Sequence, residues 1–593
     1  MEDYRRQAER FLSSETQFHL GILPTEQPHA ATRGLAETLQ SDCAAGVRML
    51  QAVDQDVAAM ARRVLDGPEV ERLVAVLSDA LSSGGRVCFA GCGATGRLSI
   101  MLEAMWRRFW REFAQQRPAL ASLSAEMADR VVSIMTGGDY ALIRSVEGFE
   151  DYTSFGRQQV READLREGDV LVAISEGGET SSVIGTLLES LDRGAHAFFV
   201  FNNPAEILAA HIERSAEVIN HPAVTVIDIA TGPMALTGST RMQATTAELL
   251  VVGAALERAL SRVLPKVLPP DELASIPAEW LDPAVGPEEF EALLDDLAAP
   301  AAVDAICAWI DIEHQLYTDG GLITYYAGDC LLDIFTDTTE RAPTFMLPPF
   351  RKCDDSVSPP SWAFVKDPLL GTPEAWLHVL GRAPRCLDWD GDRYRELDGP
   401  ASVCANPLRL GADELMKFLI GSDADASRTD VEPNVAMQVL LCSELEAADG
   451  AKWQEAFLQA AEPFARRLAA VIGATAAAPA GVEQVLRVPC RIAPTALRLW
   501  DRLATKLVLN TVSTATMGKL GRLVSNWMAN VETSNKKLID RGTRLVAELA
   551  GLDYETACIE LHRTIAELQA TARPGDARVS PVAATVERLG RAQ

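Results

Sequence analysis

The chain has 593 residues, of which 48% are hydrophobic and 23% are charged. This composition is typical of a soluble globular protein, and the length is too great for a single hydrophobic core. The formal net charge of −28 argues against a nucleic-acid or membrane partner, because such a field repels phosphate polymers and anionic surfaces.

Eleven cysteines are scattered along the chain without a C-x-x-C pair, and the N-terminus lacks an apolar signal-peptide core. Apolar stretches such as 249–256 are far shorter than the roughly 18 residues that span a bilayer. We therefore expect a cytoplasmic protein with free thiols. No histidine or cysteine spacing indicates a metal site, and we expect no cofactor.

Residues 1–70 are predicted to be helical, with an extended lead-in at 23–28. From 71 to 268, strand-like runs alternate with amphipathic helical patterns, which predicts an α/β domain with a parallel sheet covered on both faces. The predicted strands are 86–90, 131–135, 170–174, 197–201 and 224–229. Open sheets of this kind bind ligands at the carboxyl ends of their strands.

Two of these strands end in turns rich in Gly, Ser and Thr. The first strand runs into 91–97 (GCGATGR) and the third into 175–182 (SEGGETSS), and a helical pattern follows each turn. Glycine lets the backbone approach an anion, the helix N-terminus favours negative charge, and hydroxyls donate hydrogen bonds. The first turn lacks the G-x-G-x-x-G spacing of dinucleotide-binding folds. The pair predicts a phosphate held without a metal.

A proline- and acid-rich linker at 264–289 leads into a second alternating region, 285–500, which we interpret as a diverged copy of the first. Residues 321–328 parallel the first strand and its turn. The turn at 328–331 has lost its hydroxyls and carries an acid, so we expect no second phosphate site there. Weaker strand candidates in this region are 362–365, 376–380, 438–442 and 484–488.

Residues 501–593 are predicted to be entirely helical. A long apolar helix is expected at 503–523, with Ser and Thr at intervals. Asp553 is expected to be the N-cap of a later helix. We interpret this part of the chain as a C-terminal helical lid.

The two glycine-rich turns together resemble those of the sugar isomerase (SIS) domain, which binds phosphosugars through hydroxyls at these positions. Three further segments resemble the N-acetylmuramic acid 6-phosphate etherases and the related glucokinase regulatory protein. They are 137–151, 232–242 (GPMALTGSTRM) and 506–514 (KLVLNTVST), with 533–538 behind the last. The resemblance implies two SIS domains of flavodoxin-like topology in tandem, followed by the lid.

Carried over position by position, the resemblance implies one site for a hexose or amino-sugar phosphate. Thr95, Ser175 and Thr180 would donate hydroxyls, and Gly177 stands where many members have another serine. In the first copy Glu248 occupies the position of the family lysine, so Lys506, beyond the inserted domain, would complete the site. The residues expected to bind the ligand are Gly93, Thr95, Ser175, Glu176, Gly177, Thr180, Glu147, Glu150, Ser239, Arg241 and Lys506.

The etherases eliminate lactate with two glutamates, one acting as base and one as acid. Glu150 matches one of them, and Glu147 lies three residues earlier on the same expected helical face. The other family position, on the helix after the first turn, falls at Met105, which cannot transfer a proton. Glu103 is two residues away, about 200° around a helix, and is expected to point elsewhere.

The leading hypothesis from the sequence is a phosphosugar-binding regulator or sensor, with its site between the two SIS domains and the lid. A sugar kinase is its candidate protein partner, since ligand binding could change the affinity for such a partner. The alternative is an etherase with Glu150 as the base. A third possibility, an aldose–ketose phosphate isomerase, lacks an identifiable group for ring opening and proton transfer.

Overall fold

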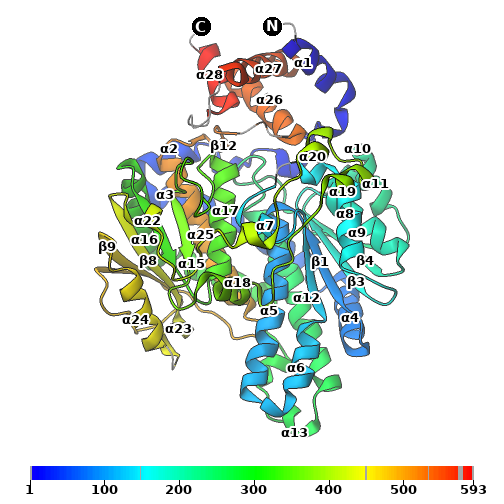
Figure 1. Ribbon diagram of the computed structural model, residues 1–593, viewed down its shortest axis with the longest axis vertical. Coiled ribbons are helices and arrows are strands. Elements are labelled where there is room, and N and C mark those ends of the chain that lie inside the picture. The colour runs from blue at the N-terminus through cyan, green and yellow to red at the C-terminus, as the bar shows by residue number, and fades with distance from the viewer. Residues whose placement is uncertain are drawn as a thin grey trace.

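The computed structural model describes residues 3–146, 148–447, 450–531, 533, 535–571 and 579–590. Two five-stranded parallel sheets flanked by helices form the body of the protein, and a small helical bundle lies at one end (Figure 1). Among the described residues, no helix is sufficiently long and apolar to cross a membrane. The predicted α/β class is confirmed.

The first sheet has the strand order β2-β1-β3-β4-β5 with every pair parallel. Its strands are β1 (Val87–Gly91), β2 (Val131–Met135), β3 (Val170–Ser175), β4 (His196–Phe201) and β5 (Val224–Asp228). Every boundary lies within one residue of the prediction. Phe89 packs into one hydrophobic core, and its neighbours Cys88 and Ala90 pack into another. The sheet is therefore buried on both faces, as a parallel sheet between helices must be.

The helices of the first 268 residues either precede this sheet or cover it. They are α1 (Asp3–Ser14), α2 (Leu35–Ser41), α3 (Cys43–Val64), α4 (Pro68–Ser83), α5 (Gly93–Gln116), α6 (Ala121–Ala128), α7 (Tyr140–Ile143), α8 (Thr153–Glu162), α9 (Ser181–Asp192), α10 (Ala205–His211), α11 (Glu213–Ile219) and α12 (Gln243–Val267). The expected extended lead-in instead forms a short 3₁₀ turn at Pro24–Glu26, because a proline occupies its first position.

The second sheet has the order β10-β9-β8-β6-β7, also parallel throughout. Its strands are β6 (Leu322–Tyr326), β7 (Ala363–Lys366), β8 (Asn434–Leu441), β9 (Arg466–Ile472) and β10 (Gln484–Val488). Counted within its own copy, this is the order 2-1-3-4-5 of the first sheet and of flavodoxin-like folds. The tandem arrangement predicted from the sequence is confirmed.

The strand predicted at 376–380 is wrong, because these residues lie in helix α18 (Thr372–Leu380). Its buried residues Ala375, Trp376, Val379 and Leu380 follow a helical period rather than alternation. The strand predicted at 438–442 covers only the second half of β8. Strand β9 was not predicted, because it begins with two arginines and contains alanines, which have low β-propensity.

The remaining helices of the second region include two short ones in the linker. They are α13 (Pro270–Leu273), α14 (Ala278–Leu281), α15 (Pro287–Ala298), α16 (Pro300–Thr318), α17 (Leu331–Phe345), α19 (Gly391–Glu396), α20 (Ala401–Ala405), α21 (Ala412–Leu415), α22 (Ala426–Thr429), α23 (Cys442–Glu446) and α24 (Gly450–Ala460). Helix α17 packs against α5 of the first domain, so the helices that follow the first strand of each copy are in contact.

The C-terminal part forms two separate structures. Helix α25 (Leu499–Lys519) packs against α12, α16 and α17 and therefore lies inside the body of the protein. The hairpin β11 (Leu523–Val524) and β12 (Trp527–Met528) leads to α26 (Lys536–Ala550), α27 (Tyr554–Thr571) and α28 (Pro581–Gly590). These three helices form the bundle at the top of Figure 1 together with the N-terminal α1, which packs on α27. The backbone N–H of Thr556 donates to Asp553 at 2.8 Å, which confirms the predicted cap.

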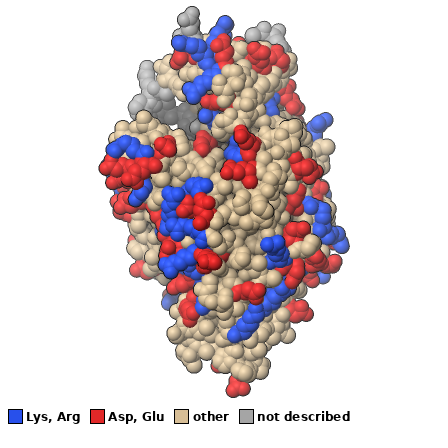
Figure 2. Space-filling view, turned by 90° about the vertical axis from the view of Figure 1, so that its right-hand side faces the viewer, with Lys and Arg blue, Asp and Glu red and all other residues tan. Residues whose placement is uncertain are grey.

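Basic and acidic side chains are intermingled on the face of the first domain seen in Figure 2. On α8 and α9, for example, Glu189 accepts hydrogen bonds from Arg157 and Arg161. Such ion pairs place carboxylates next to guanidinium groups. Each pair contributes about 0–1 kcal/mol to the stability of the fold at an exposed position.

Candidate functional site

In the turn after β1 the backbone at Gly93 is accessible, whereas the hydroxyl of Thr95 is already hydrogen-bonded within the turn. Gly93 has φ +56°, and no heavy atom lies within 4 Å of the position that a Cβ would take. The hydroxyl of the buried Thr95 donates to the carbonyl of Cys92 at 2.7 Å and accepts from its N–H at 3.0 Å. Thr95 therefore caps α5, and a phosphate at this turn would meet backbone N–H groups first.

The turn after β3 brings the hydroxyls of Ser175 and Thr180 together. The Ser175 hydroxyl donates to the Thr180 hydroxyl at 3.3 Å and accepts from the N–H of Gly178 at 3.2 Å. A Cβ at Gly177 would lie 2.8 Å from the end of the Glu179 side chain. This turn keeps two hydroxyl groups and a small backbone for an anion.

Glu150 lies beside the first turn, with its Oε2 atom 3.9 Å from the Cys92 thiol. Its Oε1 atom accepts a 2.8 Å hydrogen bond from the amide of Asn535, which is also the N-cap of α26. Lys537, in the first turn of the same helix, donates to Glu179 at 2.7 Å. The N-terminus of α26 thus contacts Glu150, beside the first turn, and Glu179, in the second turn. Glu147, the other predicted acid of this segment, lies outside the described residues.

Glu176 follows Ser175, and its side chain lies among other charges of the site. Burial raises the pKa of its carboxyl to about 7, Lys537 opposes this shift, and the carboxylates of Glu340 and Glu179 add to it. Glu248, at the position of the family lysine, lies beneath it. Burial and the charge of Glu176 raise the pKa of Glu248 well above its usual range.

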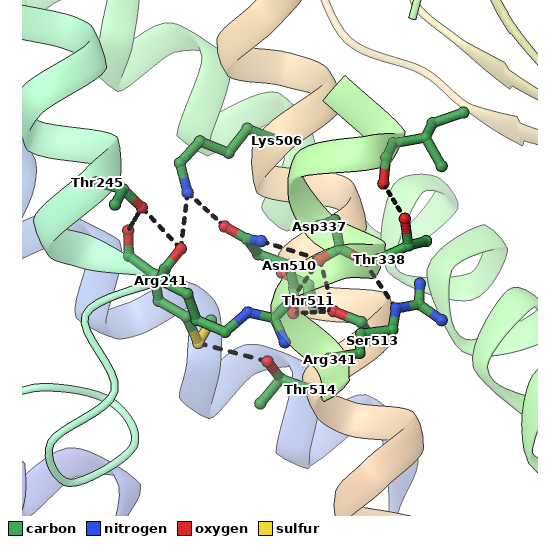
Figure 3. A network of polar contacts seen from close by, with 12 residues as sticks. Arg241, Thr245, Asp337, Thr338, Arg341, Lys506, Asn510, Thr511, Ser513 and Thr514 are labelled. Carbon is green, nitrogen blue, oxygen red and sulfur yellow. Dashed lines mark hydrogen bonds and ion pairs between the residues drawn. The ribbon is translucent and has the colours of Figure 1, made fainter. Parts of the chain in front are cut away.

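Arg241 does not contact the two turns. Its guanidinium pairs with Asp337 of α17 and donates to Ser513 of α25 at 2.6 Å, in the network drawn in Figure 3. Ser239 lies buried in the preceding turn, where its N–H donates to the carbonyl of Leu236. Arg241 therefore connects the first domain to the second, whereas the hydrogen bond of Ser239 lies within its own turn. Contact of either residue with a ligand stays a prediction.

Lys506 extends from α25 toward the first domain (Figure 3). Its Nζ atom donates to the Arg241 carbonyl at 2.8 Å and to Asn510 Oδ1 at 2.5 Å. It lines a cavity of about 30 Å³ together with Ala94 of the first turn and Glu340 of α17. Burial, with the charge of Arg241, lowers the pKa of Lys506 to about 7. Lys506 of α25 therefore lines a cavity with Ala94 of the first turn, and its contact with a phosphate stays a prediction.

Glu340 is one of the residues that the sequence did not indicate. It pairs with the buried Arg97 in the first turn of α5, although it belongs to the second domain. Met105, three helical turns along α5, instead lines a cavity with Gly328 and Asp329, at the degenerate turn of the second copy. Met105 therefore lies beside the turn of the second copy, and its correspondence to the family glutamate stays a prediction. Because α5 and α17 cross, each helix reaches the turn of the other domain.

Glu103 points away from both turns, as predicted. Its buried carboxylate accepts from Arg107 at 2.7 Å, from Arg382 at 2.9 Å and from Ser133 at 2.6 Å. Burial opposes ionisation, but these cations lower its pKa below the usual range. Glu103 stabilises the contact between α5 and the segment 381–386 of the second domain.

Three residues of the site were missed: Glu340, Asn535 and Lys537. Asn535 and Lys537 belong to segment 533–538, which resembles the etherase family, but neither residue was among those expected to bind the ligand. For Glu340 the available signal was the internal repeat, because α17 is the second copy of α5.

Residues 69–191 match the model of the glucokinase regulatory protein N-terminal SIS domain. N-acetylmuramic acid 6-phosphate etherase 1 of Bacillus licheniformis is 30% identical over 236 residues, covering 40% of this chain and 67% of the relative. The etherase of Yersinia pestis is 31% identical, covering 39% of this chain and 69% of the relative. The C-terminal domain of glucosamine-fructose-6-phosphate aminotransferase from Francisella tularensis aligns with a TM-score of 0.42 at 11% identity, covering 80% of this chain and 94% of that chain.

The chain spans from 59% to 69% of the length of the curated relatives that it matches. The matches, the tandem sheets and the two glycine-rich turns agree with one another. The chain therefore belongs to the phosphosugar-binding SIS family that includes the N-acetylmuramic acid 6-phosphate etherases and the glucokinase regulatory protein.

Proposed function

We propose that the protein binds N-acetylmuramic acid 6-phosphate and cleaves its lactyl ether. The observation that supports this most is the position of Glu340, which reaches the first turn from α17, while Glu150 lies beside the same turn. Two carboxylates in one site are what an acid–base elimination requires. The methionine at position 105 favoured a purely regulatory protein. With Glu340 as the second carboxylate, this methionine no longer argues against an etherase.

In this proposal the sugar phosphate lies at the two turns, between α26 and α25. The N–H groups of the first turn, the hydroxyls of Ser175 and Thr180, and Lys506 bind the phosphate. Glu150 removes a carbon-bound proton of the sugar, and Glu340 protonates the ether oxygen as the C–O bond breaks. Lactate leaves, and water adds to the resulting double bond.

The direct test is release of lactate from N-acetylmuramic acid 6-phosphate by the purified chain. N-acetylglucosamine 6-phosphate, which lacks the lactyl ether, serves as the binding control. We expect both compounds to bind and only the first to release lactate. Binding of both with no lactate above background would overturn the enzymatic proposal and leave phosphosugar binding intact.

A regulator is the second candidate function. It is supported by the match to the glucokinase regulatory protein domain and by the fusion of two copies in one chain, in which the turn of the second has an acid in place of its hydroxyls. A sugar phosphate bound between the domains would then change the affinity for a sugar kinase by its differential affinity for two domain arrangements. This function predicts that adding the protein changes the rate of a sugar kinase only when the sugar phosphate is present.

The affinity for sugar phosphate is expected to fall as the pH rises above about 7. Lys506 has a lowered pKa of about 7 and must be protonated to bind phosphate, so binding takes up a proton above that pH. The affinity then decreases by up to about tenfold per pH unit. Glu176, with a pKa of about 7, acts in the same direction because its carboxylate repels phosphate. Below about pH 6 the phosphate itself becomes protonated.

Calorimetric titrations with N-acetylglucosamine 6-phosphate between pH 6.5 and 8.5 measure this dependence. Lys506→Met is expected to bind more weakly and with a shallower pH dependence, whereas Glu176→Gln keeps the contribution of the lysine. An unchanged slope in Lys506→Met would show that the lysine is not the titrating group.

A further inference from the structure

Two neighbouring cavities that share part of their lining lie between the second domain and residues 143–145 of the first. The outer cavity, of about 630 Å³, is formed by the segment 346–359 together with Arg144, Trp362 and Arg522. The inner cavity, of about 230 Å³, extends to Tyr317, Thr339 and Arg341. The lining residues common to both are Arg144, Leu347, Pro348, Pro349, Phe350 and Trp362.

The outer cavity is lined by three arginines that have no carboxylate partner among the described residues. Arg144 makes no side-chain hydrogen bond or ion pair there. Arg351 donates to the backbone carbonyl of Ser358 at 2.9 Å, and Arg522 lies over the Trp362 ring at 5.3 Å. All three are half-buried. In a chain with a net charge of −28, in which arginines such as Arg161 pair with carboxylates, three guanidinium groups around one cavity without a carboxylate partner in the described part of the chain are unusual.

The single acid of this lining does not neutralise them. The carboxylate of Asp355 accepts the N–H groups of Val357 and Ser358 at 3.0 and 2.9 Å. These hydrogen bonds, first of all those from Ser358, lower the pKa of Asp355 to about 2, so it is ionised. Three arginines and one aspartate give the outer cavity a formal charge of +2. A phosphate monoester carries a charge of about −1.5 to −2 at pH 7, which complements this lining.

The inner cavity has a different chemistry. Beneath its wall, three polar atoms are buried without a hydrogen-bond partner: Thr339 Oγ1, Ser361 Oγ and Arg341 Nη2. Buried polar atoms normally have partners, so unpaired donors and acceptors at a cavity indicate a polar occupant. Pro348 and Phe350 supply apolar surface on the same wall. A carbon skeleton with hydroxyl groups suits this combination.

We propose that the two cavities form a second binding site, for a small phosphorylated sugar or polyol. The phosphate binds Arg144, Arg351 and Arg522 in the outer cavity, because guanidinium groups match phosphate oxygens in bidentate geometry. The hydroxylated part of the ligand enters the inner cavity. This site is distinct from the proposed catalytic site: Glu340 faces the first domain, whereas the next residue, Arg341, lines the inner cavity.

The test separates the two sites by mutation. In the variant Ser175→Ala/Lys506→Met, which disables the proposed catalytic site, we expect glucose 6-phosphate to bind at one remaining site by calorimetry. Inorganic phosphate is expected to compete with it. Adding Arg144→Gln and Arg522→Gln should weaken this binding by about tenfold or more for each arginine removed. The matched control, Arg166→Gln/Arg395→Gln, removes exposed arginines that pair with Asp164 and Asp392 and should leave the binding unchanged.

No binding of glucose 6-phosphate in the first variant, or binding that is insensitive to the loss of Arg144 and Arg522, would overturn the proposal. If the combined variant does not fold, Arg144→Gln alone decides the question, since its side chain has no hydrogen-bond or ion-pair partner within the described ranges. Failure here leaves the lactate assay unaffected, because that assay depends on the other site.

Discussion

Replacing Glu340 by glutamine is expected to lower the rate of lactate release by about 100- to 10,000-fold, the usual effect of removing an acid or base. Glutamine keeps the size of the side chain and an oxygen for Arg97, which also donates to the carbonyls of Leu142 and Ala141. The affinity for N-acetylglucosamine 6-phosphate is therefore expected to change little. Glu150→Gln is expected to have an effect of similar size on the rate.

Deuterium exchange distinguishes the roles of the two glutamates. The proposed base, Glu150, removes a carbon-bound proton before or as the ether breaks, so Glu340→Gln should still exchange this proton with solvent while lactate release is slow. Glu150→Gln should abolish both. The control Glu396→Gln changes an exposed carboxylate paired with Arg393 and should behave as wild type. Full activity in Glu340→Gln would contradict the assignment of Glu340 as the acid and leave the etherase activity in place.

Asp337→Asn is expected to destabilise the protein by about 3–5 kcal/mol, because it removes the charge that compensates buried guanidinium groups. Asp337 pairs with Arg241 and, at 2.9 Å, with Arg341, and it accepts from Ser513 and Asn510 at 2.8 and 3.1 Å (Figure 3). Its side chain is 3% exposed. Burial opposes ionisation, yet the two arginines hold the pKa of Asp337 below its usual range.

Urea unfolding followed by circular dichroism measures this effect as a lower midpoint. The double variant Arg241→Gln/Asp337→Asn removes both charges and should cost less than the sum of the single variants, because no unpaired charge remains between the two positions. Asp392→Asn, in an exposed pair with Arg395, is the control and should change stability by less than about 1 kcal/mol. If the double variant loses as much stability as the two single variants together, the charges of Arg241 and Asp337 are not coupled.

The elements of the first domain could be read from the sequence because each is encoded locally. Its strands are continuous apolar runs, and the turns at 91–97 and 175–182 carry their glycines and hydroxyls within a few residues. The elements of the second domain were harder to predict from the sequence. Strand β9 is rich in arginine and alanine, and α18 was mistaken for a strand because short apolar runs suit either structure.

Candidate site residues separated along the chain were only partly predictable. Lys506 could be named from its motif, although 265 residues separate it from Arg241, whose carbonyl it contacts. Arg241 was expected at the ligand, but the structure pairs it with Asp337. A motif shows which residue types a site uses, whereas the partner of a buried charge depends on which helices pack together.

The sequence by itself determined the fold class, the duplication, and the two turns that offer backbone and hydroxyl donors to a phosphate. These depend on composition and spacing within single strands, turns and helices. Only the tertiary structure decided which acid accompanies the intact turn. Because α5 and α17 cross at the contact between the two copies, Met105 reaches the degenerate turn and Glu340 reaches the intact one. The direction of a side chain across a domain contact is set by packing, and no local pattern along either helix encodes it.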